Sequence, residues 1–262
     1  MPGNPSLAHV SAGGHRIAYM RHEGRGPALV FLHEGLGSIR LWRDFPARVA
    51  EATGHTALVY DRYGYGDSDV LRDERVGKDF MHHEALVELP ALLKALDVRE
   101  PILIGHSDGA SIALIHAGGA HDVRGVVAMA PHVFVEDSGL ASIRRIREGF
   151  VSSGLRDRLG KYHRDPSRTF HLWNDAWLDP AFRSWNIEEY VAGIRCPVLA
   201  IQGEADEYGT MAQLDAIARQ TGGPCELLKL ADCGHAPFRD QPEAVLKAIV
   251  AFVDKVGKIG DA

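Results

Sequence analysis

Hydrophobic positions along the 262-residue chain fall into two recurring patterns, short continuous runs and longer periodic stretches. Continuous runs of aliphatic and β-branched residues are typical of strands that are buried on both faces. They predict strands at 28–32, 56–60, 102–104, 123–130, 198–202 and 226–230. Weak alternation on either side of Gly13 and Gly14 predicts an opening hairpin of strands 8–11 and 16–21.

The periodic stretches lie between these runs and predict helices. Helix-like spacing covers 42–53, which ends at Gly54, and then 81–96, 110–117, 211–219 and 242–256. Pro90 lies inside the second of these stretches, so we expect that helix to bend there. Strands that alternate with helices require crossover connections, which predicts an α/β fold with a largely parallel sheet.

Residues 131–193 break the alternation. This segment holds three of the four tryptophans and several amphipathic runs, and it has no strand-like stretch. We interpret it as a helical insertion above the carboxyl ends of the strands, where open α/β sheets bind ligands. The expected organisation is therefore one core domain formed by 1–130 and 194–262, with 131–193 inserted in it.

The junction between the strand at 102–104 and the helix at 110–117 reads Gly-His-Ser-Asp-Gly, residues 105–109. A chain that turns at once from strand to helix forms a tight corner, and glycines leave room for the crossing backbones. G-x-S-x-G in this context is typical of a nucleophile elbow with Ser107 at its tip. The amide of Asp108, at the helix N-terminus, is then the natural first donor to an oxyanion.

A nucleophilic serine needs a base, and the base needs an orienting acid. His235 lies in a Gly-containing loop after the strand at 226–230, and Asp206 lies in the loop after the strand at 198–202. Both loops are expected at the same sheet edge as Ser107. The chain order serine, acid, histidine is the order of α/β-hydrolases.

Five stretches together resemble the α/β-hydrolase superfamily over nearly the whole chain: FLHEGLGS, YDRYGYGDSD, GHSDGAS, IQGEADEYG and CGHAPFRDQPEAV. The resemblance implies an α/β-hydrolase fold, mostly parallel and flanked by helices. It also implies Ser107 as nucleophile, His235 as general base and then acid, and Asp206 as the acid that orients His235. Residues 131–193 would then correspond to the family's mobile lid.

One departure from the family pattern concerns the oxyanion hole. The family usually has His-Gly after the third strand, whereas this chain has His33, Glu34 and Gly35. By position, Gly35 takes over the amide that completes the hole together with Asp108. Glu34 then brings a carboxylate near the acyl oxygen, where it would oppose negative charge unless it is turned away or paired.

Two interpretations of the acids Glu34 and Asp108 stay open. In the first, Asp108 complements the positive end of its helix and Glu34 pairs with a partner such as Arg62. In the second, both carboxylates attract a cationic group of the substrate. Further candidates for substrate contact are His33, His132, Trp173 and Trp177, and packing within the insertion is the alternative for the two tryptophans.

Composition and charge narrow the classes of partner. A net charge of −6 argues against nucleic acid and anionic membranes as partners, and no run of 18 apolar residues occurs. Three cysteines without a C-x-x-C pair, and an N-terminus without a signal pattern, predict a cytoplasmic protein. The adjacent histidines His82 and His83 would point in different directions on a helix, so we expect neither metal nor cofactor.

The sequence therefore predicts a serine hydrolase that cleaves a small carboxylic ester through an acyl-enzyme. Serine at the elbow, rather than aspartate, argues against epoxide hydrolase and haloalkane dehalogenase chemistry. Two alternatives share the triad: a hydrolase of carbon–carbon bonds in dienoates or diketones from aromatic breakdown, and a ligand receptor without turnover. The expected partner is a small-molecule substrate, and whether the chain forms a homo-oligomer is left open.

Overall fold

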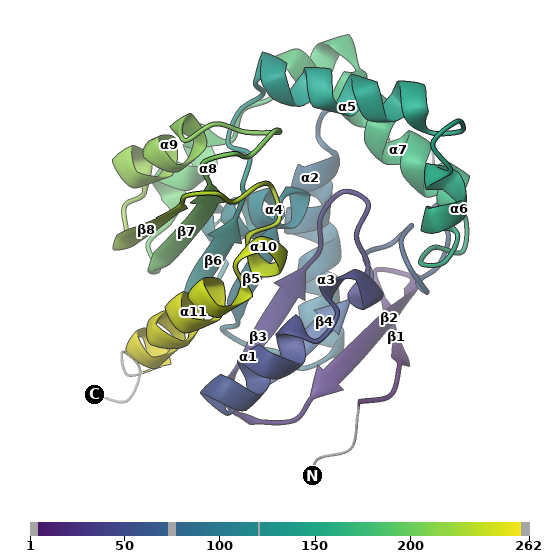
Figure 1. The fold of residues 1–262 in the computed structure, drawn as a ribbon. Helices are drawn as coiled ribbons and strands as arrows, with labels where there is room; N and C mark the ends of the chain where they lie inside the picture. The colour runs from purple at the N-terminus through teal and green to yellow at the C-terminus, as the bar shows by residue number, and fades with distance from the viewer. Residues whose placement is uncertain (1–4, 73–76, 120, 258–262) are drawn as a thin grey trace.

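Eight strands form one sheet in the order β1-β2-β4-β3-β5-β6-β7-β8 (Figure 1). The computed structural model describes residues 5–72, 77–119 and 121–257. The strands are β1 (Ala8–Ala12), β2 (His15–His22), β3 (Arg25–Leu32), β4 (His55–Tyr60), β5 (Ile102–His106), β6 (Gly125–Met129), β7 (Val198–Gly203) and β8 (Cys225–Leu230). β1, β2 and β4 pair antiparallel, and all remaining pairs are parallel. The predicted α/β fold, including its opening hairpin, is confirmed.

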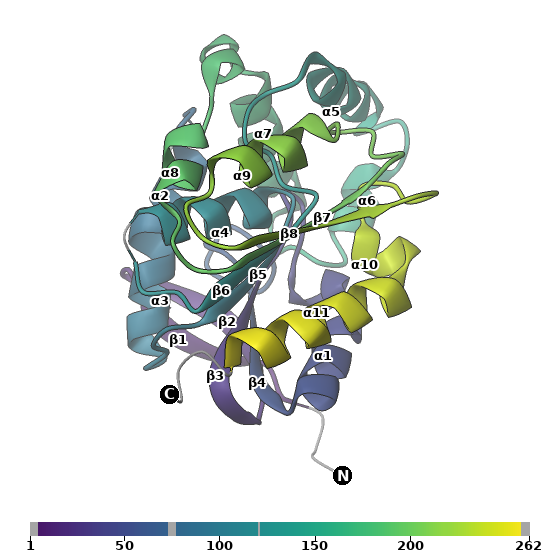
Figure 2. The same ribbon diagram turned by 90° about the vertical axis from the view of Figure 1, so that its left-hand side faces the viewer.

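Helices cover both faces of the sheet, and the two faces form separate cores (Figure 2). Within β3, Leu29 and Phe31 join the core beneath α1 and α11, whereas Val30 and Leu32 join the core on the other face. This alternation follows from the two-residue period of a strand.

The helices are α1 (Phe45–Thr53), α2 (Phe80–His83), α3 (Leu89–Ala95), α4 (Asp108–Gly118), α5 (Asp137–Gly149), α6 (Leu155–Leu159), α7 (Pro166–Leu178), α8 (Glu188–Gly193), α9 (Ala212–Gln220), α10 (Pro237–Asp240) and α11 (Pro242–Gly257).

The helix predicted at 42–53 begins later than expected. A short 3₁₀ turn, η1 (Ile39–Trp42), comes first, and α1 starts only at Phe45. Pro46 explains the start, because proline lacks an N–H and is tolerated in the first turn of a helix but not in its interior. At the other end, Gly54 closes the helix in the left-handed region at φ 69°, as predicted.

The long helix predicted at 81–96 is divided by a π turn, η2 (Glu84–Glu88), that lies between α2 and α3. Pro90 follows as the second residue of α3. A proline cannot donate the usual backbone hydrogen bond, and its ring displaces the carbonyl of the preceding turn. The wider π turn absorbs this disturbance while the helical path continues, so the predicted site of irregularity is correct although its form differs.

Most of the segment 131–193 lies above the carboxyl ends of the strands, where α5, α6 and α7 form a layer of their own (Figure 1). A 3₁₀ turn, η3 (Pro180–Ser184), follows, and a single bridge joins Phe134 to Asn186. The last helix, α8, leaves this layer and packs against α4 beside the sheet. The part that covers the strand ends is therefore shorter than the predicted insertion.

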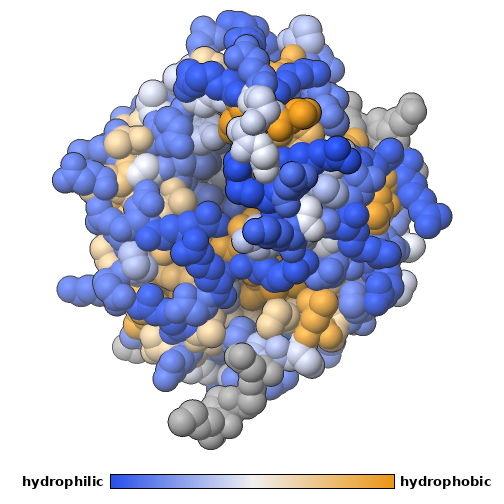
Figure 3. All heavy atoms as spheres, turned by 45° about the vertical axis from the view of Figure 1, so that its right-hand side comes forward, coloured by the Kyte–Doolittle hydropathy of each residue, from blue (hydrophilic) through white to orange (hydrophobic). Residues whose placement is uncertain are grey.

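The outer surface on the side of α6 and α7 is mainly hydrophilic, and hydrophobic residues form small separate patches on it (Figure 3). Val151, in the turn after α5, is the most exposed large hydrophobic residue among those described, at 79%. Within the described ranges, no helix combines the length and the apolar character needed to cross a bilayer.

Candidate active site

Ser107 occupies a sharp corner between β5 and α4. Its backbone lies at φ 53° and ψ −122°, a strained conformation for a residue with a side chain. The flanking glycines permit the corner. A Cβ on Gly105 would lie 2.3 Å from the carbonyl oxygen of Gly109, and a Cβ on Gly109 would lie 2.1 Å from that of Leu32. The elbow geometry expected from G-x-S-x-G is therefore present.

Three side chains from different loops form one hydrogen-bonded chain. The Nε2 atom of His235 lies 2.9 Å from Oγ of Ser107, and its Nδ1 atom lies 2.9 Å and 3.0 Å from the two carboxylate oxygens of Asp206. Because a carboxylate only accepts, Nδ1 carries the hydrogen. Nε2 is then free to accept the hydrogen of the Ser107 hydroxyl.

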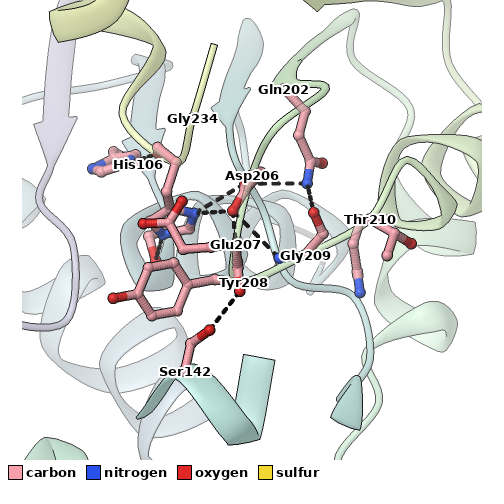
Figure 4. Close-up of polar contacts among 12 residues, drawn as sticks. His106, Ser142, Gln202, Asp206, Glu207, Tyr208, Gly209, Thr210 and Gly234 are labelled. Carbon is pink, nitrogen blue, oxygen red and sulfur yellow. Dashed lines mark hydrogen bonds and ion pairs between the residues drawn. The ribbon is translucent and has the colours of Figure 1, made fainter. Parts of the chain in front are cut away.

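Asp206 is surrounded by donors (Figure 4). The amides of Tyr208 and Gly209 donate to Oδ1 at 2.8 and 3.3 Å, and Nε2 of Gln202 donates to Oδ2 at 3.2 Å. Burial alone would raise the pKa of Asp206, but the hydrogen bond from His235 and the other donors hold the pKa below its usual value. The carboxylate therefore stays ionised and fixes the tautomer of His235.

Two unused backbone amides lie beside Ser107. Gly35, in the loop after β3, and Asp108, the first residue of α4, both line the cavity at the serine. Neither amide donates to another residue within the described ranges. Free N–H groups next to a nucleophile, one of them at a helix N-terminus, form an arrangement that can hold an oxyanion.

Glu34 lines the cavity at Ser107, and its carboxylate pairs with side chains other than the expected Arg62. Its Oε2 lies 3.4 Å from Nδ1 of His106, and its Oε1 lies 3.7 Å from a guanidinium nitrogen of Arg239. Burial would raise the pKa of Glu34, but His106 and Arg239 hold it well below its usual range. Arg62 instead donates to the backbone carbonyl of Glu34, at 2.9 Å.

His33 does not contact the cavity, which corrects the prediction that it meets substrate. Its ring is fully buried. Nε2 accepts from the amide of Arg62 at 3.1 Å, and Nδ1 lies 2.7 Å from the carbonyl oxygen of Glu34. Burial lowers the pKa of His33 well below its usual value, so the ring is neutral with the hydrogen on Nδ1. His33 thus joins two loops beneath the site.

Asp108 contacts the segment above the sheet. Its Oδ1 accepts from Nε1 of Trp177, on α7, at 3.2 Å, while Oδ2 has no partner among the described residues. Burial raises the pKa of Asp108 to about 6, and the charge of Arg62 opposes this rise. The position at the first turn of α4 is favourable for an acid, in line with the structural interpretation.

A cavity of about 150 Å³ opens at Ser107. The candidates for substrate contact that line it are Glu34, His132, Trp173 and Trp177, and the sequence did not single out Leu36, Ile143, Ile146 or Tyr208. The ring of Tyr208 lies 4.5 Å from that of His235, centroid to centroid. Tyr208 could have been predicted as a site residue from the sequence, because it lies two residues after Asp206 in the same loop. Burial lowers the pKa of His132 to about 3, so it lines the cavity as a neutral ring.

No group of three histidine, cysteine or acidic side chains within the described ranges is arranged to hold a metal ion. The rings of the two adjacent histidines meet different neighbours. His82 lies 5.2 Å from the ring of Tyr190, and Nε2 of His83 lies 3.1 Å from Glu88.

Known proteins resemble this chain in sequence and in fold. The family model described as "Alpha/beta hydrolase family" matches residues 29–248. N-formylmaleamate deformylase of Pseudomonas putida is 28% identical, over 94% of this chain and 96% of its own length. Two solved structures share the fold. Haloalkane dehalogenase DbeA of Bradyrhizobium elkani has a TM-score of 0.79 and 20% identity, and the match covers 98% of this chain and 100% of the dehalogenase chain. A meta-cleavage product hydrolase of Pseudomonas fluorescens has a TM-score of 0.74 and 16% identity, and the match covers 95% of this chain and 97% of the hydrolase chain.

Proposed function

The chain belongs to the alpha/beta hydrolase family, and on that premise we propose that it is a serine hydrolase that cleaves a small carboxylic ester through an acyl-enzyme. The observation that carries the proposal is the continuous hydrogen-bonded chain from Ser107 through His235 to Asp206. The strained serine at the end of this chain and the unused amides beside it support a nucleophilic role.

In the proposed reaction, Nε2 of His235 removes the hydroxyl proton of Ser107 while Oγ attacks the ester carbonyl. The amides of Gly35 and Asp108 hold the oxyanion, and ionised Asp206 stabilises the imidazolium. His235 then gives the proton to the leaving alcohol, and the acyl group stays on Ser107. A water, deprotonated by His235, attacks this acyl-enzyme, and release of the acid restores the serine.

The size and lining of the cavity favour a short or single-ring hydrophobic acyl group. A cavity of about 150 Å³ has the volume of one that holds a benzene ring. Its apolar side chains include Leu36, Ile143 and Ile146. Five of its twelve lining residues come from 131–193, so we further propose that this segment acts as the lid of the site.

Replacement of Ser107 by alanine tests the proposal. We expect kcat on p-nitrophenyl acetate to fall on the order of 10⁴-fold or more, because the nucleophile is lost. Ser111→Ala is the matched control. It removes a buried hydroxyl one turn further along α4 that bonds to the backbone of His132 at 2.7 Å and lies outside the cavity lining. Near wild-type turnover by the Ser107→Ala protein would overturn the proposal.

The same assay separates the two alternatives that share this triad. Turnover of every ester slower than about one per minute, against about 1–10³ s⁻¹ for typical enzymes, together with tight ligand binding would indicate a receptor. Loss of the colour of a dienoate faster than any ester is cleaved would indicate a carbon–carbon bond hydrolase. Either result contradicts the proposed esterase activity.

A further inference from the structure

A second cavity, of about 260 Å³, adjoins the one at Ser107. Trp173 lines both cavities, so they meet at this residue. Tyr65, Phe80 and Leu172 form part of the apolar wall of the second cavity, and Arg62 and Glu84 supply charge. The proposed ester hydrolysis uses none of these five side chains at the reacting atoms, so the cavity has no role in that reaction as described.

Arg62 is a buried cation with few partners. The residue is 1% exposed. Its guanidinium donates one hydrogen bond, to the carbonyl of Glu34, and lies 4.3 Å above the ring of Tyr65. Its Nε has no partner, and it forms no ion pair with a carboxylate in the part of the chain that the structure describes. Burial alone would lower the pKa of Arg62, and the nearby groups Tyr65, Glu84 and Asp108 act against this, but neither described acid lies within ion-pair distance of the guanidinium. An anion in direct contact is therefore the simplest account of the unused donor.

The acids around this cavity do not supply that anion at short range. Glu84 lies in the π turn and is 9% exposed, and burial raises its pKa to about 7, against the opposing charge of Arg62. Glu88 is already engaged by Nε2 of His83, at 3.1 Å. Asp79 is exposed to solvent. Near neutral pH the charge of Arg62 is therefore opposed only at longer range, by Asp108 and by the ionised fraction of Glu84.

We propose that this cavity is a second subsite of the substrate site, in which Arg62 binds a carboxylate group of the substrate. That the ligand is the substrate rests on the proposed hydrolase function, whereas the recognition of a carboxylate rests on the cavity alone. A guanidinium offers five N–H donors in a planar fork that matches a carboxylate, and apolar walls accept an aromatic or aliphatic body.

Equilibrium binding to the Ser107→Ala protein tests the recognition without turnover. The probes are 3-phenylpropionate, 3-phenylpropionamide and 3-phenylpropylamine, which share one body and differ in charge. We expect the carboxylate to bind at least tenfold tighter than the amide, by isothermal titration calorimetry at pH 7. Equal binding of all three probes, or tightest binding of the amine to the acids around the cavity, would overturn the proposal.

Variants locate the bound carboxylate. We expect Arg62→Gln to remove the difference between carboxylate and amide, and Leu172→Phe, which fills the second cavity, to weaken both probes. Ile143→Phe is the matched control, because Ile143 lines only the cavity at Ser107. If Ile143→Phe abolished binding and Leu172→Phe did not, the ligand would lie at the serine and the proposal would be wrong.

Hydrolysis tests whether the ligand is the substrate. The pair is the mono-p-nitrophenyl ester of a straight-chain dicarboxylic acid and its methyl ester, which differ only in the distal carboxylate. We expect a KM about tenfold lower for the free acid in the wild-type protein, and no difference in Arg62→Gln. Equal KM values would overturn the substrate assignment. If the wild-type protein hydrolysed no ester but still bound the carboxylate probe, the proposed hydrolase function would be wrong and carboxylate recognition would stand. The two failures are therefore distinct.

Discussion

Trp173 lies directly against Gly35: a Cβ on Gly35 would come within 2.0 Å of Nε1 of Trp173. One residue belongs to α7, above the sheet, and the other belongs to the loop after β3 that carries a proposed oxyanion donor. The contact leaves no room for a methyl group. The upper layer and the loop that carries the Gly35 amide are therefore in direct contact at this pair of residues.

We expect Gly35→Ala to lower kcat on the order of 10²–10³-fold, the effect of losing one oxyanion donor, because the methyl group displaces the loop or the indole. In the double variant Gly35→Ala, Trp173→Ala the indole is gone, so part of the lost kcat should return. Gly149→Ala, where a Cβ has no neighbour closer than 3.7 Å, is the control for a glycine change in the same layer. A double variant no faster than Gly35→Ala would contradict this role of the contact.

Trp173 should also set the length of the acyl group. Its replacement by alanine widens the place where the cavities of about 150 and 260 Å³ meet, so we expect the preferred neutral p-nitrophenyl ester to shift from short acyl chains to chains of eight carbons or more. The readout is kcat/KM along a series from acetate to dodecanoate. Leu172→Ala enlarges only the second cavity and should leave the preference for short chains in place. An unchanged profile in the Trp173 variant would disprove the idea that Trp173 limits the length of the acyl group.

Much of the fold could be predicted because its signals are local. Buried parallel strands appear as continuous apolar runs, and the elbow depends on glycines two residues either side of Ser107. Departures from the predicted elements arise where a proline meets a helix. Pro46 delays α1, and Pro90 follows the π turn; in both cases the sequence marks the place and tertiary packing decides the geometry.

The charged part of the site was harder to predict because pairing depends on residues that are distant in sequence. Glu34 was expected to meet Arg62, but its carboxylate lies against His106 and Arg239, which are 72 and 205 positions further along the chain. Arg62 follows the strand that ends at Tyr60 and so could have been noted as a charge at the sheet edge. That its guanidinium is buried with a single hydrogen bond could not be predicted, because this depends on how the loops around it are assembled.

Glu84 provides a test of stability against pH. Its pKa is raised from 4.5 to about 7 by burial, so the folded protein holds this proton between those values while the unfolded chain releases it. Stability should therefore fall as pH rises from 4.5 to 7, by about 3 kcal/mol at most for this group. Arg62 and Glu88 act on its pKa, and Glu84 in turn acts on Tyr60 and Tyr65.

The variant Glu84→Gln isolates this contribution, because glutamine keeps the shape and cannot ionise. We expect Glu84→Gln to gain stability relative to the wild type at pH 8 and to show a smaller gain at pH 5. Urea unfolding at the two pH values measures the difference. Glu88→Gln is the control, because that side chain is partly exposed and pairs with His83. A gain that is the same at both pH values would contradict the raised pKa.

The two acids near Ser107 differ in how far they can act on the charge of an acyl group. Glu34 is compensated by His106 and Arg239, so it offers little attraction to a cation. Asp108 lines the cavity and has one carboxylate oxygen without a partner among the described residues. A substrate ammonium about 5 Å from this carboxylate would gain about 3 kcal/mol at an effective dielectric near 20.

We therefore expect a higher kcat/KM for the methyl ester of phenylalanine than for that of 3-phenylpropionate, by up to about 100-fold at pH 7.5. The ratio should fall at pH 5, because Asp108, with a pKa of about 6, is then mostly protonated. Protonation of His235 slows both esters alike and cancels in the ratio. Asp108→Asn should bring the ratio near one at both pH values while neutral esters keep most of their rate. Equal kcat/KM values for the two esters in the wild type would contradict electrostatic selection. The carboxylate of Asp108 would then interact only with Trp177 and with the N-terminus of α4.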